Sequence, residues 1–189
     1  MPKEKNELWK KYIERTRDNP PTPDLIRALA FVQLRGRALE LGSGTFTDVK
    51  YLLAQGFEHV VAVDRIDLAR EIYNELPPDK VDYEISSFED YKFPTGEYDL
   101  VNAQLSLPFS PPKSFGTVFR NILHSLKPGG IFVGQLFGQR DFRNTPENGI
   151  STHTREQVEL LLDDSEVIEL QEKEFDKLVA GEMKHSHIF

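Results

Sequence analysis

The sequence predicts an α/β protein with a doubly wound, three-layer architecture. Short apolar runs alternate with stretches of helical periodicity between residues 37 and 136. This alternation is typical of a mostly parallel sheet whose crossover helices cover both faces. A Gly-x-Gly turn follows the first apolar run, where such folds place a ligand-binding loop. The length of 189 residues suits one domain with a substantial core.

Two helices are expected before the first strand. Residues 4–17 place Trp9, Tyr12 and Ile13 on one face, which predicts an amphipathic helix. The prolines at positions 20 and 21 end it. A second helix is predicted from Pro23 to residue 30, with Thr22 as its N-cap.

Strands and helices then follow one another along the chain. Strands are expected at residues 37–41, 59–63, 81–85, 98–103 and 131–136. Helices are expected after Gly44, at residues 67–76 and after Pro112, where apolar residues recur at i, i+3, i+4 and i+7. Thr154 and Gln157 predict a capping box. Residues 166–175 and 184–189 are expected to form the last two strands.

Composition excludes several kinds of chemistry. The chain has no cysteine, so it has no disulfide, thiolate zinc site, iron–sulfur cluster or cysteine nucleophile. Its net charge of −8 argues against nucleic acid as a partner. We find no secretory signal and no apolar run long enough for a membrane span, so a cytoplasmic location is expected.

The residues around the glycine turn indicate the charge of its ligand. Glu40 precedes Gly42, Ser43 and Gly44, and Asp64 ends the next predicted strand, where a ribose-binding carboxylate is expected. A dinucleotide would bring a pyrophosphate to the turn, and Glu40 would repel it. S-adenosylmethionine carries an ammonium, a sulfonium and a ribose, so its charges suit these carboxylates better.

These motifs together resemble those of class I S-adenosylmethionine-dependent methyltransferases. The resemblance rests on Glu40-Leu-Gly-Ser-Gly, on the strand ending at Asp64, on Tyr98-Asp-Leu-Val-Asn-Ala-Gln and on Leu126-Lys-Pro-Gly-Gly. It implies a seven-stranded sheet with an antiparallel last strand and an N-terminal lid helix. The whole chain, residues 1–189, would then be one domain, with residues 1–21 as the lid and residues 22–189 as the Rossmann-like core.

The resemblance also implies roles for individual residues. S-adenosylmethionine would be the cofactor and S-adenosylhomocysteine the product. Glu40 would orient the ammonium, and Asp64 would hold the ribose hydroxyls. The full set implied for cofactor binding is Glu40, Gly42, Ser43, Gly44, Asp64, Arg65, Ser87, Phe88, Asn102, Ala103 and Gln104.

The methyl acceptor is expected to be a small molecule. The absence of a cysteine nucleophile and of an Asn/Asp-Pro-Pro motif after residue 101 argues against methylation of nucleic-acid bases. Trp9, Tyr12, Phe109, Phe137 and Arg140 are the candidates for acceptor binding, and Tyr12, Asp141 and His153 are the candidates for catalysis. His185 and His187 lie two residues apart, but we expect no metal.

A narrower resemblance and two alternatives stay open. The segments after residues 136 and 183 resemble small bacterial tellurite-resistance and thiopurine-type methyltransferases. The first alternative is an NAD(P)-dependent oxidoreductase, although Thr47 stands where the dinucleotide motif has its third glycine. The second is a non-catalytic cofactor-binding or regulatory protein. A monomer or a homodimer is expected.

Overall fold

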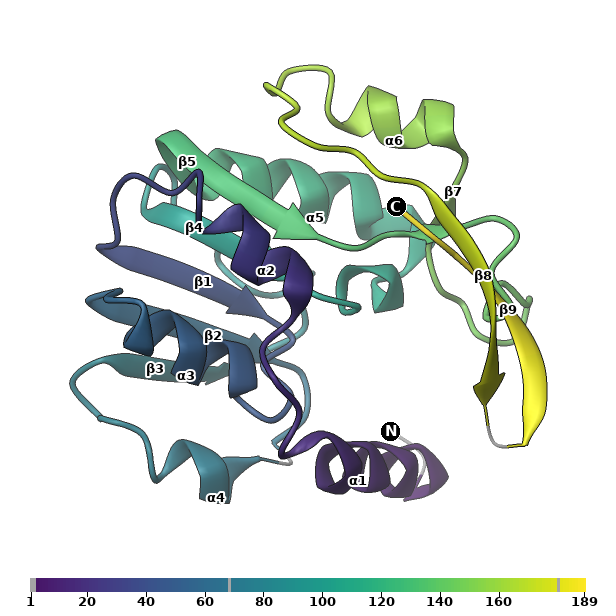
Figure 1. Cartoon of the computed structure of the whole chain (residues 1–189), viewed down its shortest axis with the longest axis horizontal. Helices are drawn as coiled ribbons and strands as arrows, with labels where there is room; N and C mark the ends of the chain where they lie inside the picture. Colours follow the sequence, from purple (N-terminus) through teal and green to yellow (C-terminus); the bar gives the residue numbers. More distant parts are fainter. Residues whose placement is uncertain (1–2, 68, 180) are drawn as a thin grey trace.

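The structure is a computed structural model that describes residues 3–67, 69–179 and 181–189, with side chains from Trp9 onward. Five parallel strands form the main sheet in the order β3-β2-β1-β4-β5 (Figure 1). Their bounds are β1 Arg37–Leu41, β2 His59–Asp64, β3 Val81–Ile85, β4 Tyr98–Ala103 and β5 Leu126–Gly134. The predicted doubly wound architecture is therefore confirmed for these strands.

Helices cover both faces of this sheet (Figure 1). One face packs Ala38, Val60 and Leu100 against α2 (Pro23–Ala28), α3 (Thr47–Ala54) and α4 (Arg70–Tyr73). The other face packs Leu39 and Val101 against α5 (Pro112–Ser125) and α6 (Arg155–Leu161). Neighbouring residues of one strand thus enter opposite cores, as strand geometry requires.

The first helix, α1 (Lys3–Thr16), lies beside the carboxyl ends of the strands rather than on a face of the sheet (Figure 1). The chain then enters α2, where Thr22 occupies the N-cap position without the expected side-chain cap. The Thr22 hydroxyl instead donates to Asp48 Oδ2 at 2.9 Å. At the other end of the chain the capping box of Thr154 and Gln157 is confirmed.

The described residues form two separate sheets rather than the predicted single seven-stranded sheet. The remaining strands build a second sheet in the order β7-β6-β9-β8. Their bounds are β6 Phe137–Gly138, β7 Thr152–His153, β8 Lys173–Val179 and β9 Glu182–Ile188. β9 runs antiparallel to β6 and β8, so the expected direction of the last strand is confirmed even though its sheet is separate.

Residues 135 and 136 connect β5 of the main sheet to β6 of the second sheet. A Cβ at Gly134 would lie 2.9 Å from the carbonyl oxygen of Ala103, so a larger residue would not fit here. The side chain of Gln135 then donates to Asp24 of α2 at 2.6 Å. Backbone pairing resumes at Leu136, which exchanges two hydrogen bonds with Phe189.

Candidate functional site

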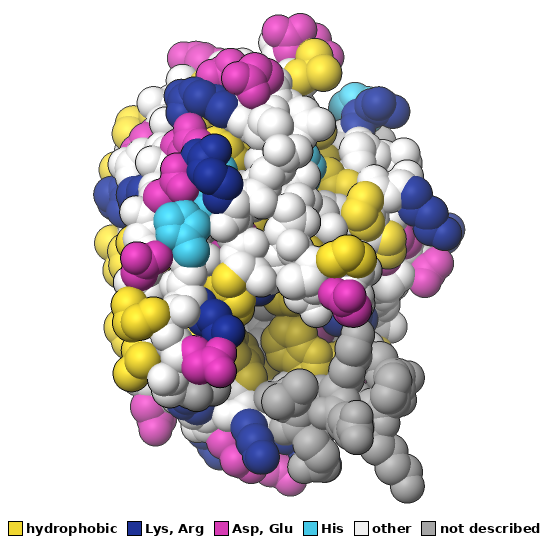
Figure 2. Space-filling view, turned by 90° about the vertical axis from the view of Figure 1, so that its right-hand side faces the viewer, with side chains coloured by type: hydrophobic (Ala, Val, Ile, Leu, Met, Phe, Trp, Pro, Cys, Tyr) yellow, Lys and Arg dark blue, Asp and Glu magenta, His cyan; other side chains and the backbone are white. Residues whose placement is uncertain are grey.

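A cavity of about 220 Å³ opens at the carboxyl ends of β1, β2 and β4. The strand order reverses between β1 and β4, so the cavity lies at the topological switch point of the sheet. Figure 2 shows the face toward which the strands point, and that face is hollowed beside hydrophobic side chains. The predicted cofactor residues that line the cavity are Glu40, Gly42, Ser43, Gly44, Asp64, Arg65, Ser87, Phe88 and Gln104.

Gly42 lies where no side chain could be accommodated. Its φ is +83°, and a Cβ would lie 2.4 Å from the Cβ of Ser106. Ser106 is held in place because its hydroxyl donates to the carbonyl oxygen of Leu41 at 2.6 Å. The turn therefore requires glycine both for its backbone conformation and for the close approach of the loop after β4.

Asp64 is fixed by backbone amides at the end of β2. The N–H of Gly44 donates to Oδ2 at 3.2 Å, and the N–H of Ile66 donates to Oδ1 at 3.1 Å. Burial raises the pKa of Asp64, and these two amides partly offset the rise. The carboxylate is thus held in one orientation at the cavity wall, where a hydroxyl donor could satisfy its remaining lone pairs.

Glu40 is the most deeply buried carboxyl at the site, with 3% of its surface exposed. Burial, with the nearby charge of Asp48 as a second cause, raises its pKa well above the ordinary value of 4.5. The amide of Asn102 donates to Glu40 at 2.8 Å and to Asp48 at 3.2 Å. A cationic group in the cavity would favour the ionised form of Glu40.

Asn102 and Ala103, which were predicted to contact the cofactor, are not among the described residues that line the cavity. Asn102 is fully buried behind Glu40, and its side-chain oxygen Oδ1 accepts a hydrogen bond from the side-chain amide of Gln104 at 3.0 Å. It acts on the cavity through its neighbours, because Glu40 and Gln104 both reach the wall.

The sequence analysis missed Asp48, which lies in the first turn of α3 and lines the cavity. Asp48 accepts from the backbone and the hydroxyl of Thr22, each at 2.9 Å. An acidic residue at this position ordinarily serves the helix dipole, so the sequence offered no signal that set it apart. The conformation of Leu105 was also missed: this cavity residue has a φ of +51°.

Aromatic side chains form the wall on the side of α1. Trp9 and Tyr12 come from α1, and Phe109 comes from the 3₁₀ helix η1 (Leu107–Phe109). The Trp9 ring is edge-to-face with Tyr12 at 5.7 Å and with Phe109 at 5.6 Å between centroids. Burial raises the pKa of Tyr12, with Arg15 acting in the opposite direction. Tyr12 is therefore a hydrogen-bond donor at neutral pH rather than a ready base.

The structure places four of the predicted residues outside this cavity. Phe137 lies behind Phe109, edge-to-face at 6.0 Å. Asp141 is buried and accepts from the Arg143 guanidinium at 3.1 Å. His153, in β7, packs against an aromatic ring of α5, and burial lowers the pKa of His153. Arg140 is engaged elsewhere, in the cluster described next. Together with Asn102 and Ala103, six predicted residues are therefore absent from the described lining, the other four being Phe137, Arg140, Asp141 and His153.

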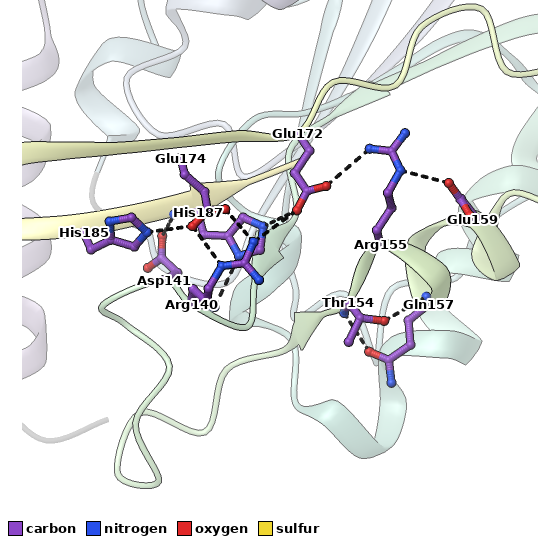
Figure 3. Close-up of polar contacts among 10 residues, drawn as sticks. All are labelled: Arg140, Asp141, Thr154, Arg155, Gln157, Glu159, Glu172, Glu174, His185 and His187. Carbon is purple, nitrogen blue, oxygen red and sulfur yellow. Dashed lines mark hydrogen bonds and ion pairs between the residues drawn. The ribbon is translucent and has the colours of Figure 1, made fainter.

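Glu172, Glu174 and His187 lie close enough to be considered as a metal site, within 4.8 Å of one another (Figure 3). The His187 Nδ1 accepts from the backbone N–H of Arg140 at 3.2 Å, so its proton is on Nε2 and points to Glu172 at 2.8 Å. A metal at Nε2 would require the lone pair that this proton occupies.

Cations already neutralise this cluster. The Arg140 guanidinium bonds to Glu174 and Glu172, and the bond to Glu174, with a second from His185, lowers the pKa of Glu174 to about 2. The arrangement ties β8, β9 and the loop after β6 together (Figure 3). We interpret it as a structural ion-pair cluster, and the absence of a metal stays a prediction.

Residues 38–130 match a protein family described as a methyltransferase domain. This stretch, just under half of the chain, is similar to methyltransferase domains. This match spans β1 to the first half of β5 and includes both the glycine turn and Asp64. No curated protein matches the chain by sequence. Of the described residues, none lies in a helix with the length and apolar character of a membrane span.

Solved structures of two methyltransferases and of a cyclase share the fold. The 1,6-didemethyltoxoflavin-N1-methyltransferase of Burkholderia thailandensis, bound to S-adenosylhomocysteine, is 17% identical, with a TM-score of 0.65 over 100% of this chain and 89% of that one. A methyltransferase of Leishmania major is 19% identical, with a TM-score of 0.63 over 96% and 83%. The [4+2]-cyclase SpnF is 20% identical, with a TM-score of 0.62 over 78% and 58%.

The Leishmania major protein is described as dependent on S-adenosylmethionine, and the residues of the cavity in this chain fit that molecule. Gln104 Oε1 is buried in the wall without a hydrogen-bond partner, so it can accept a hydrogen bond from an ammonium. Glu40 and Asp64 supply carboxylates, and no pyrophosphate has to be accommodated beside them. A Cβ at Gly44 would have only the carbonyl oxygen of Gly42 within 4 Å, at 3.9 Å, so the second glycine of the turn is not crowded by neighbouring side chains.

Proposed function

We propose that the chain transfers the methyl group of S-adenosylmethionine to a small-molecule acceptor by in-line displacement. One observation carries this proposal: the same cavity is lined by Glu40 and Asp64 on one side and by Trp9 and Phe109 on the other. A cofactor and an acceptor would therefore meet in one cavity, where a small acceptor can lie against the aromatic rings.

The residues would divide the work between binding and alignment. Asp64 would accept from the ribose hydroxyls, and Glu40 with Gln104 would fix the ammonium. When bound, the cofactor supplies an activated methyl group on a positively charged sulfur. The aromatic wall would exclude water and orient the acceptor, and alignment of this kind supplies much of the rate enhancement in a displacement.

We further propose that α1 is a lid and that residues 22–189 form the core on which it closes. The support is the placement of α1: it lies beside the strand ends, and Trp9 of α1 contacts Phe109 next to the cavity. The narrower likeness to tellurite-resistance and thiopurine-type enzymes and the choice between monomer and homodimer stay predictions.

Isothermal titration of the purified chain with S-adenosylhomocysteine tests the proposal, with NAD and NADP as controls. We expect one-to-one binding of S-adenosylhomocysteine at micromolar concentrations and no binding of either dinucleotide. Binding of NAD or NADP instead would contradict the proposal and favour the alternative of an NAD(P)-dependent oxidoreductase. Binding of S-adenosylhomocysteine without turnover of S-adenosylmethionine across a broad acceptor panel would favour a non-catalytic cofactor-binding protein.

A further inference from the structure

We propose that the acceptor is a small amine, methylated on nitrogen and held in an aromatic box made of Trp9, Tyr12 and Phe109. This inference rests on the proposed function and specifies its substrate class. It is carried by the ring geometry, the charge of the cavity and an unpartnered hydroxyl beside the rings.

The aromatic box presents π-surfaces at steep angles to one another. Trp9 is inclined by 81° to Tyr12 and by 79° to Phe109, and all three rings line the cavity. The three rings pack edge-to-face on one another, and the ring faces that border the cavity would attract an organic cation through their quadrupoles. The Tyr12 ring already binds one cation, because the guanidinium of Arg15 lies 5.8 Å from its centroid.

The cavity carries an excess of negative charge. Four carboxyl side chains line it, whereas Arg65 is the one Lys or Arg among the described lining residues, and it follows Asp64 at the cofactor end. Arg15 lies over the Tyr12 ring but does not line the cavity, so no described basic side chain in the cavity wall beside the aromatic box offers a counter-ion to a carboxylate or phosphate acceptor. The four acidic residues are Glu40, Asp48, Asp64 and Glu89.

The movement of charge during the reaction distinguishes an amine from an oxygen acceptor. The lone pair of a neutral amine forms the new N–CH₃ bond as the C–S bond breaks and its electrons remain on sulfur. The positive charge passes from sulfur to nitrogen, and a proton is then lost from that nitrogen to water. An oxyanion acceptor would cancel the charge instead. The aromatic box stabilises a cation throughout only in the first case.

Ser110 supplies a hydrogen-bonding group for the amine. It follows Phe109, lines the cavity and is 97% buried, since 3% of its surface is exposed. Its hydroxyl has no hydrogen-bond partner. A buried hydroxyl without a partner is costly, and an N–H group of the acceptor would remove that cost.

The single tryptophan of the chain makes the inference testable, because Trp9 is itself part of the box. The full chain, saturated with S-adenosylhomocysteine, is titrated with choline, its uncharged isostere 3,3-dimethyl-1-butanol and the anion 3,3-dimethylbutanoate, and Trp9 emission is recorded. We expect choline to bind roughly tenfold more tightly than the isostere and the anion to bind most weakly. Equal binding of choline and the isostere would overturn the amine assignment.

Ring removal supplies the matched variants. Tyr12→Leu and Phe109→Leu should each abolish most of the preference for choline, whereas Phe175→Leu, on the exposed face of β8, should leave it unchanged. The two box variants could instead weaken the binding of S-adenosylmethionine while leaving the binding of S-adenosylhomocysteine and the preference for choline unchanged. The rings would then contact the sulfonium, and the inference would be wrong.

The same samples separate the inference from the proposed function. Titration calorimetry that shows S-adenosylhomocysteine binding without a choline preference contradicts only the amine acceptor. Absence of S-adenosylhomocysteine binding contradicts both.

Discussion

Two buried carboxyl groups depend on the amide of one residue. Glu40 and Asp48 both accept from Asn102, and all three are at least nine-tenths buried. Carboxyl groups placed this close repel each other when ionised, and burial strengthens the repulsion. Asn102 therefore makes the pair tolerable and aims Glu40 at the cavity.

Replacement of Asn102 should be costly for this reason. Asn102→Ala leaves two buried carboxyl groups short of a donor, and we expect the free energy of unfolding to fall by roughly 1–3 kcal/mol. Urea denaturation measures it. Asn121→Ala, the same change on the exposed side of α5, should shift stability by less than about 0.5 kcal/mol. Equal effects of the two substitutions would contradict the role given to Asn102.

Asp64 is expected to govern affinity for the cofactor. Asp64→Ala removes a charged acceptor from the ribose, and binding of S-adenosylhomocysteine should weaken at least tenfold, about 1.4 kcal/mol. Asp67→Ala serves as the control, because Asp67 is exposed and pairs with Arg70. Calorimetry measures the dissociation constant of S-adenosylhomocysteine for both variants. An unchanged value for Asp64→Ala would show that Asp64 does not bind the cofactor.

The raised pKa of Glu40 predicts how stability depends on pH. In the folded chain burial favours the protonated acid, so its stabilising effect is fully present below the ordinary pKa of 4.5 and is lost as pH rises through the higher folded value. Glu40→Gln should therefore gain stability relative to the unmodified chain as pH rises above 4.5. Denaturation curves at several pH values should show this widening difference, and a constant difference would contradict it.

Several residues of the site could be predicted because their types carry the signal. Glycine at position 42 marks a positive φ, and a carboxylate at the end of the second strand marks a sugar hydroxyl. Asp48 carried no such signal, since its partners Thr22 and Asn102 are 26 and 54 residues away. Only the tertiary fold brings those three together.

Among the elements, α1 is the one most separable from the fold. Its described contacts include the edge-to-face pair of Trp9 with Phe109 and the packing of Ile13 on the core. We expect a chain that lacks residues 1–17 to unfold cooperatively, as measured by circular dichroism, but to lose binding of choline by calorimetry. Trp9→Ala in the full chain should reproduce the binding defect. A truncated chain that fails to fold would make α1 part of the core.

The strands show the limit of pattern reading at the element scale. The runs at 37–41, 81–85 and 98–103 were predicted with the bounds that the structure shows, because their apolar residues are bracketed by turns. The division into two sheets was not predicted, because the second sheet is built by pairing between segments distant in the sequence, as Phe137 pairs with Ile188. β8 also begins at Lys173, later than expected, because the residues before it pair with no strand.

At the scale of the whole molecule, the alternation of strands and helices was enough to place the cavity. Parallel strands end at one edge, and the reversal of strand order at β1 opens a crevice there. The sequence did not indicate whether an amine, a carboxylate or an alcohol is the acceptor. The aromatic box, on which that choice depends, joins residues from two separate segments, 9–12 and 109.

The bond between Asn102 and Glu40 joins strands whose paired residues are 62 positions apart. Long-range pairing of this kind forms slowly, so we expect the site to be assembled late in folding. A ligand that recognises only the assembled site stabilises the native state and not the folding transition state. In stopped-flow experiments S-adenosylhomocysteine should therefore slow unfolding and leave the refolding rate unchanged. Bound ligand would then lengthen the lifetime of the native state.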